Sequence, residues 1–210
     1  MTNSNDKLIW GTDMKQRGRL LLTAQGLNTK EGYQLIKRQL HRETLSRKRI
    51  YVFYEPYYSI EVELLNACQK LGFSRDNIIL SSQANSASEI KKVNYIYVTE
   101  GNTFHILKLL QERKLLQPIR EAVLAGACYI GASAGAVIAG RDIAIAGLMD
   151  ENEVELEDLQ ALGLVDGGVC PHMSKRQLHE MVRSAELDGL MSYNKIYAIA
   201  EGRILCLKRK

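Results

Sequence analysis

The most informative segment of this 210-residue chain reads Ala127-Cys128-Tyr129-Ile130-Gly131-Ala132-Ser133-Ala134-Gly135-Ala136. An apolar run ends there in Gly-x-Ser-x-Gly, and a helical pattern of small residues continues through Ala139. This order is typical of a nucleophile elbow, in which a tight turn between a strand and a helix carries a serine in strained backbone angles. We therefore predict that Ser133 stands at the carboxyl end of a strand and at a helix N-terminus, where free amides favour negative charge. The alternative is a turn rich in glycine and alanine that only packs a helix on a sheet.

Strand-like and helix-like segments alternate along the rest of the chain. Apolar strand patterns occupy 19–24, 50–54, 77–80, 93–98, 128–131 and 168–171, and helical patterns occupy 28–45, 58–71, 103–113, 118–125 and 174–185. Several of the strands are apolar throughout, which indicates a mostly parallel sheet with helices on both faces. We predict one α/β domain over residues 19–210, preceded by a polar segment at 1–18. Ligands in such sheets bind beyond the carboxyl ends of the strands, a position shared by Thr99–Asn102, Ser133, His172 and Glu201.

Composition narrows the class of protein. The net charge of +4, with 46% hydrophobic and 25% charged residues, is ordinary for a soluble globular protein. The basic cluster at 37–49 lacks interleaved aromatic residues, so we expect no nucleic-acid partner. No apolar run approaches the roughly 20 residues that span a bilayer, which favours a cytoplasmic protein without a membrane partner. The four cysteines (Cys68, Cys128, Cys170 and Cys206) are widely spaced and suggest neither a disulfide framework nor a zinc site, so we expect no metal or cofactor.

A serine hydroxyl becomes a nucleophile when a base accepts its proton and an acid orients that base. His172 closes the apolar strand 168–171, which places it on the same edge as Ser133, although a capping or loop histidine is the alternative. The other histidines (His41, His105 and His179) lie in helical patterns.

Two acids are candidates for orienting His172. Asp150 lies in an acidic loop that could instead be a solvated surface leading into a helix near 155–162. Glu201 lies in a Glu-Gly turn between the last two strands, which could instead be an ordinary hairpin turn.

An oxyanion hole requires backbone amides aimed at the developing negative charge. One amide would come from Ala134, directly after the serine. The second would come from Gly101, in a strand-to-helix junction where Asn102 or Thr103 can cap the helix.

With these pieces in place, the sequence resembles the peptidase E family of serine peptidases, which includes aspartyl dipeptidase and cyanophycinase. The matching segments appear in the family's order and cover about half of the chain: 97–104, 129–136, 161–165, Pro171-His172 and 200–202. The resemblance implies a flavodoxin-like three-layer α/β sandwich related to class I glutamine amidotransferase domains, with serine in place of cysteine at the elbow. It also implies metal-independent hydrolysis through an acyl-enzyme.

Carried over residue by residue, the resemblance makes Ser133 the nucleophile and His172 the general base. Gly101 and Ala134 match the oxyanion donors, while Asp150 and Glu201 both remain candidates for the orienting acid. One departure is Glu100, which replaces the first glycine of the family's Gly-Gly-Asn-Thr-Phe turn. Its carboxylate could repel the developing charge, bind a substrate ammonium group or face solvent.

A second departure follows His172. Aspartyl dipeptidases carry an arginine-containing loop there, whereas Met173–Arg176 runs directly into a helical pattern. Strict Asp-X specificity is therefore not expected, although Lys175 or Arg176 could substitute. We assign Glu100, Asn102 and Arg176 to substrate binding.

The sequence thus predicts a serine exopeptidase that acts as a dipeptidase on short peptides. Two alternatives remain open: an α/β-hydrolase esterase, and a catalytically silent protein that binds a small metabolite or a protein partner. A homo-oligomer is also left open.

Overall fold

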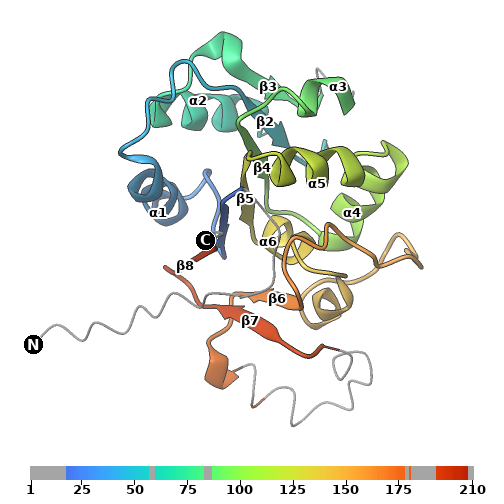
Figure 1. The fold of residues 1–210 in the computed structure, drawn as a ribbon. Coiled ribbons are helices and arrows are strands. Elements are labelled where there is room, and N and C mark those ends of the chain that lie inside the picture. Colours follow the sequence, from blue (N-terminus) through green and yellow to red (C-terminus); the bar gives the residue numbers. More distant parts are fainter. Residues whose placement is uncertain (1–17, 57–59, 83–86, 178–179, 181–192, 208–210) are drawn as a thin grey trace, which may run out of the picture.

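A six-stranded sheet forms the centre of the protein (Figure 1). The structure is a computed structural model, and it describes residues 18–56, 60–82, 87–177, 180 and 193–207. The strand order is β3-β2-β4-β5-β1-β8. Five strands run parallel, and the last is antiparallel to β1. Their bounds are β1 Leu20–Thr23, β2 Ile50–Phe53, β3 Ile78–Leu80, β4 Tyr95–Val98, β5 Cys128–Ala132 and β8 Ile204–Leu207. Every residue of β1, β2, β4 and β5 is buried, as expected of strands covered on both faces.

Alternate side chains of these strands point into two separate cores. Leu21 packs on one face with residues of α1 (Lys30–Leu40) and α2 (Glu61–Leu71). Leu20 and Leu22 pack on the other face with α4 (Thr103–Glu112), α5 (Leu116–Leu124) and α6 (Ala134–Ile138). Figure 1 shows α1 and α2 on one side of the sheet and α4, α5 and α6 on the other. The predicted three-layer α/β sandwich is thereby confirmed.

Short elements and a second sheet complete the described part of the chain. They are α3 (Ala87–Ile90), the 3₁₀ helices η1 (Arg75–Asn77) and η2 (Ala144–Leu148), and the strands β6 (Gly168–Pro171) and β7 (Ile196–Ile199). β6 and β7 pair in parallel as a separate two-stranded sheet. This small sheet lies beside α6 (Figure 1).

Two predicted helices differ from the structure. The helix predicted at 28–45 begins after Thr29, whose side chain accepts from the amide of Gly32, and ends at Leu40. The segment 155–162 is not helical, although its charges suggest a helix. Gln111 of α4 donates to the carbonyl of residue 158 in this segment, and Lys108 donates to that of residue 154 just before it.

Parts of three other predictions fall outside the described residues. They are the polar segment at 1–18, of which only Gly18 is described, the first two residues of the helix predicted at 58–71, and most of the helix predicted at 174–185. Within the described part of the chain, no helix is both long enough and apolar enough to cross a membrane.

Candidate active site

The turn that carries Ser133 is built from close backbone contacts. Ser133 directly follows β5 and has φ 47° and ψ −110°, a strained conformation for a residue with a side chain. A Cβ atom at Gly131 would lie 2.4 Å from the carbonyl oxygen of Gly135, and one at Gly135 would lie 2.2 Å from that of Val98. The buried Tyr129 hydroxyl donates to the Gly135 carbonyl at 2.7 Å. Only glycine fits at positions 131 and 135, which explains the Gly-x-Ser-x-Gly pattern physically.

The segment between α6 and β6 fixes the small sheet against the elbow. Leu162 donates to the carbonyl of Ile138, and Leu164 and Val165 both donate to that of Ala139. The Arg141 amide donates a hydrogen bond to the carbonyl of Gly167, which lies just before β6. The chain leaving α6 is therefore tied back to the end of the same helix, and β6 starts from a defined position.

His172 and Glu201 emerge at the same end of the small sheet. β6 and β7 are parallel with Pro171 opposite Ile199, so the residues that follow both strands lie together. His172, with φ 63°, turns its ring so that Nε2 lies 2.8 Å from Ser133 Oγ. Its Nδ1 lies 2.5 Å from Glu201 Oε1. The side chains of His172 and Glu201 are 41% and 55% exposed, so the site opens to solvent.

The Glu-Gly turn at Glu201 is not a hairpin. β7 belongs to the two-stranded sheet, whereas β8 pairs with β1 in the central sheet. The turn therefore crosses from one sheet to the other, which brings the Glu201 carboxylate beside His172.

Two backbone amides remain available at the strand ends. Neither the Gly101 amide nor the Ala134 amide has a hydrogen-bond acceptor among the described residues. The Gly135 amide donates to the carbonyl of Thr99 at 3.1 Å, which ties the elbow to the turn that contains Gly101. Amides in such positions can receive an oxyanion that forms next to the serine.

Asp150 binds Thr103 and not His172. Its Oδ2 accepts from the amide of Thr103 at 2.9 Å and from the Thr103 hydroxyl at 2.5 Å, at the N-terminus of α4. Of the two acids that the sequence left open, Glu201 is the one in contact with His172. Asp150 instead stabilises the start of α4, where a negative charge complements the helix dipole.

The three residues that we assigned to substrate binding are engaged within the chain. Glu100 accepts from the amide of Gly26 at 2.5 Å and from the side chain of Asn28 at 2.8 Å, so it joins the loops that follow the two strands flanking β5. Asn102 caps α4 and donates to the carbonyl of Glu151. Arg176 donates to Glu180 and is 88% exposed.

Sequence reasoning missed Glu55, the second residue after β2, which is buried and hydrogen-bonded to His105 of α4. The available signal was an acidic residue at the carboxyl end of an apolar strand, the same rule that led to Ser133. Among the described residues, no group of three or more histidine, cysteine, aspartate or glutamate side chains could hold a metal ion.

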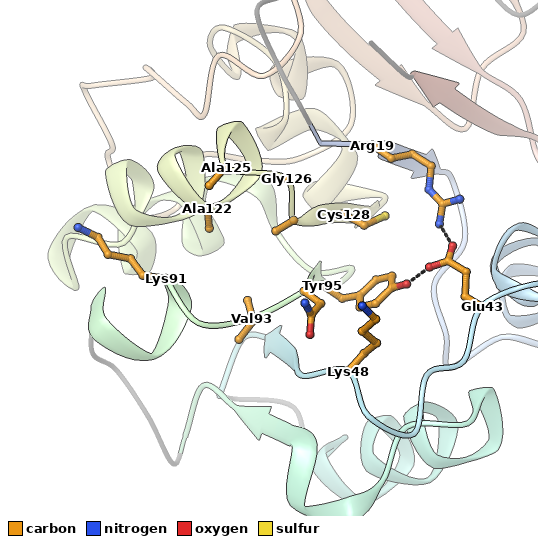
Figure 2. A pocket seen from close by; sticks show the side chains of 12 residues that line it. Arg19, Glu43, Lys48, Lys91, Val93, Tyr95, Ala122, Ala125, Gly126 and Cys128 are labelled. Atoms are coloured by element: carbon orange, nitrogen blue, oxygen red, sulfur yellow. Dashed lines mark hydrogen bonds and ion pairs between the residues drawn. The ribbon is translucent and has the colours of Figure 1, made fainter. Parts of the chain in front are cut away.

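A pocket of about 460 Å³ lies at the opposite edge of the central sheet (Figure 2). Arg19, Tyr95 and Cys128 line it at the amino ends of β1, β4 and β5, and Lys48 and Lys91 contribute cationic side chains. Glu43 accepts from both Arg19 and Tyr95 there. Because Ser133 follows the carboxyl end of β5, this pocket does not belong to the serine site.

The fold and this arrangement are those of α/β proteins that present a serine on a nucleophile elbow. The family model of peptidase family S51 matches residues 20–210, so the chain belongs to that family. This membership confirms the resemblance to the peptidase E family.

Individual relatives agree with this assignment. An uncharacterized peptidase of Listeria monocytogenes is 30% identical over 148 residues, covering 69% of this chain and 72% of the relative. The Peptidase E of a Nostoc species is 30% identical over 161 residues, 73% of this chain and 65% of the relative. A crystal structure of a Listeria monocytogenes EGD-e protein assigned to peptidase E has a TM-score of 0.65 and 24% identity, over 92% of this chain and 99% of that one. At that identity the likeness is one of fold.

Proposed function

We propose that the protein is a serine peptidase that cleaves short peptides through an acyl-enzyme formed on Ser133. The observation that carries this proposal is the hydrogen-bonded chain from Ser133 Oγ to His172 Nε2 at 2.8 Å and from His172 Nδ1 to Glu201 Oε1 at 2.5 Å. Membership of a peptidase family supports peptide bonds as the substrate.

The geometry suggests an ordinary order of proton transfers. His172 donates from Nδ1 to the Glu201 carboxylate, which leaves Nε2 free to accept the Ser133 proton while Oγ bonds to the substrate carbonyl carbon. The carbonyl oxygen gains negative charge, which the Gly101 and Ala134 amides can receive. His172 then returns the proton to the leaving amine as the carbon–nitrogen bond breaks. Water, deprotonated by the same imidazole, hydrolyses the remaining ester and frees Ser133.

We further propose that the substrates are dipeptides and other short peptides with a free N-terminus, without a requirement for aspartate. An aspartate requirement needs a cation held next to the serine. Arg176, the arginine nearest His172 in sequence, is largely exposed and bonded to Glu180. A relaxed preference for the first residue is therefore the expected outcome.

The site geometry favours the peptidase over the two alternative functions. An α/β-hydrolase esterase has its acid between nucleophile and histidine in sequence, whereas the acid in contact with His172 here is Glu201, which follows the histidine. The catalytically silent alternative was motivated by Glu100 in place of a family glycine. The bonds of its carboxylate to Gly26 and Asn28 support a structural role for this residue, and the labelling experiment below tests the alternative.

The direct test is hydrolysis of a dipeptide panel that includes Asp-X, Lys-X and Ala-X substrates, by the wild-type protein and by Ser133→Ala. The variant should lose activity and labelling by a fluorophosphonate probe while keeping its melting temperature. Ser174→Ala is a matched control, because this half-buried serine near His172 bonds only to Gln177 among the described residues. Equal hydrolysis by wild type and Ser133→Ala would refute the mechanism.

A further inference from the structure

The pocket at the amino ends of the central strands is space that the chain leaves open (Figure 2). Its volume of about 460 Å³ lies within the range of pockets that hold small molecules. Small residues create the room where α5 ends and the chain turns into β5. They are Ala122, Ala125, Gly126 and Ala127. A Cβ atom built on Gly126 would meet no atom within 4 Å apart from its neighbours in sequence, so the space beside this turn is large enough for a small organic ligand.

The walls of the pocket offer apolar contact. Val93 and Tyr95 line it from the start of β4, and Cys128 lines it from the start of β5. All three are buried residues of the hydrophobic cores, which fixes their positions. Burial raises the pKa of the Cys128 thiol to about 11, so the thiol is neutral and weakly nucleophilic at neutral pH. The walls therefore suit an apolar ligand body and provide no reactive group for covalent attachment.

The charges of Arg19 and Glu43 cancel each other inside the pocket. Arg19 Nη2 lies 2.5 Å from Glu43 Oε1, and the Tyr95 hydroxyl donates to the same carboxylate. Burial raises the pKa of Tyr95, and the hydrogen bond to Glu43 raises it further, so this phenol is neutral. These three side chains form a neutral hydrogen-bonded group, which leaves the other charges of the lining to select a ligand.

One of the two remaining cations is explained by its neighbours in the chain. Lys91 directly follows α3, and a cation is favoured at the carboxyl end of a helix. Its Nζ also lies 3.0 Å from Glu121 Oε2 of α5. Lys91 adds positive charge to the lining, but its position requires no ligand.

Lys48 and Asn94 carry hydrogen-bond donors that no described group accepts. Lys48 lies in the connection between α1 and β2, and Figure 2 shows its side chain extending toward Tyr95. Its ammonium group has neither an ion-pair partner nor a hydrogen-bond acceptor among the described residues. Asn94 Oδ1 accepts from the Arg49 amide at 3.0 Å, and the NH₂ group of the same side chain has no acceptor within that part of the chain. Both groups call for an acceptor in the pocket.

We propose that this pocket binds a small organic anion, with its carboxylate or phosphate group on Lys48 and Asn94 and its apolar body against Val93. Three cations and one anion line the pocket, so the net charge of +2 disfavours a cationic ligand. The site is independent of the proposed function, because Cys128 and Ser133 lie at opposite ends of β5.

The test is a titration of the 210-residue chain with phenyl phosphate and with benzoate, followed by heteronuclear NMR. Saturable binding should shift the Asn94 side-chain amide and the Gly126 backbone amide. Benzyl alcohol, which is neutral, and benzylamine, which is cationic, should bind at least about fivefold more weakly than the better anion. The better anion shows whether the ligand is a phosphate ester or a carboxylic acid. Benzyl alcohol that binds as tightly as either anion, or shifts confined to other parts of the chain, would overturn the proposal.

Two variants and a control locate the anion. Lys48→Met keeps a long side chain without its charge, so binding of the better anion should weaken by about fivefold while that of benzyl alcohol is unchanged. Lys92→Met removes an exposed cation that does not line the pocket and should change the dissociation constant by less than about twofold. Equal weakening in these two variants would mean general attraction of anions to a basic surface and would overturn the proposal.

The second variant, Ala125→Phe, fills the pocket. Ala125 is exposed and has the right-handed helical angles φ −77° and ψ −10°, so a larger side chain is tolerated there. This variant should keep its melting temperature and lose binding of both anions. Undiminished binding by a folded Ala125→Phe protein would place the anion outside the pocket and refute the assignment.

Discussion

Replacing Glu201 by glutamine measures what the carboxylate contributes to the site. Glutamine keeps the size of the side chain and an oxygen that accepts from His172 Nδ1, so the main loss is one negative charge beside the imidazolium that forms during the reaction. At about 4 Å, two unit charges interact by about 1 kcal/mol in water and by about 4 kcal/mol at an effective dielectric constant of 20. The His172 and Glu201 side chains are 41% and 55% exposed, which places the interaction toward the lower value. We expect a loss of about 2 kcal/mol in the transition state, or roughly 30-fold in kcat.

The assay compares kcat on one dipeptide for Glu201→Gln and Asp150→Asn. Asparagine at position 150 keeps an acceptor for the Thr103 amide, so we expect less than about threefold in kcat and at most about 1 kcal/mol in stability. Melting temperatures of both variants serve as the control for folding. A larger loss of kcat in Asp150→Asn than in Glu201→Gln would refute the reasoning, because it would make Asp150 the acid that acts on His172.

Three further predictions concern the elbow and the buried thiols. Gly135→Ala places a Cβ atom 2.2 Å from the Val98 carbonyl, so we expect a loss of several kcal/mol and little folded protein, as measured by soluble yield and circular dichroism. Tyr129→Phe removes the 2.7 Å hydrogen bond to the Gly135 carbonyl and should lower the free energy of unfolding by about 1 to 2 kcal/mol in urea titration, whereas an unchanged value would mean that the bond is not formed. Burial raises the pKa of the Cys128 and Cys170 thiols from an ordinary value of about 9 to about 11. The unfolded chain therefore loses these protons first, and stability present below pH 9 should fall between pH 9 and pH 11 by about 2 to 3 kcal/mol per thiol, a fall that Cys128→Ala should reduce.

Much of the fold follows from local chemistry that a sequence displays. The all-apolar strands require cover on both faces, and the Gly-x-Ser-x-Gly spacing predicts a crowded turn. The structure confirms the crowding, since neither Gly131 nor Gly135 has room for a side chain. The rule that ligands bind at carboxyl ends also singled out Ser133, His172 and Glu201 from among many polar residues.

The remaining features depend on contacts between distant segments. Asp150 and Glu201 both carry a carboxylate, and only their contacts with Thr103 and His172 distinguish their roles. The helix expected at 155–162 is absent, and Gln111 of α4 instead donates to the carbonyl of Asp158 there, a contact between distant segments that local propensity does not contain. Glu55 stood at a strand end like the others, but its burial depends on how α4 packs.

The division of the site between two sheets has a thermal consequence. Ser133 follows a strand of the central sheet, whereas His172 and Glu201 follow the strands of the small sheet, which packs on α6 in a shared apolar core. Local separation of the small sheet from the central sheet costs less free energy than unfolding the whole protein. A displacement of about 1 Å is enough to misalign Ser133 and His172. On warming, enzymatic activity should therefore be lost reversibly at a temperature several degrees below that at which the far-ultraviolet circular dichroism signal begins to decline.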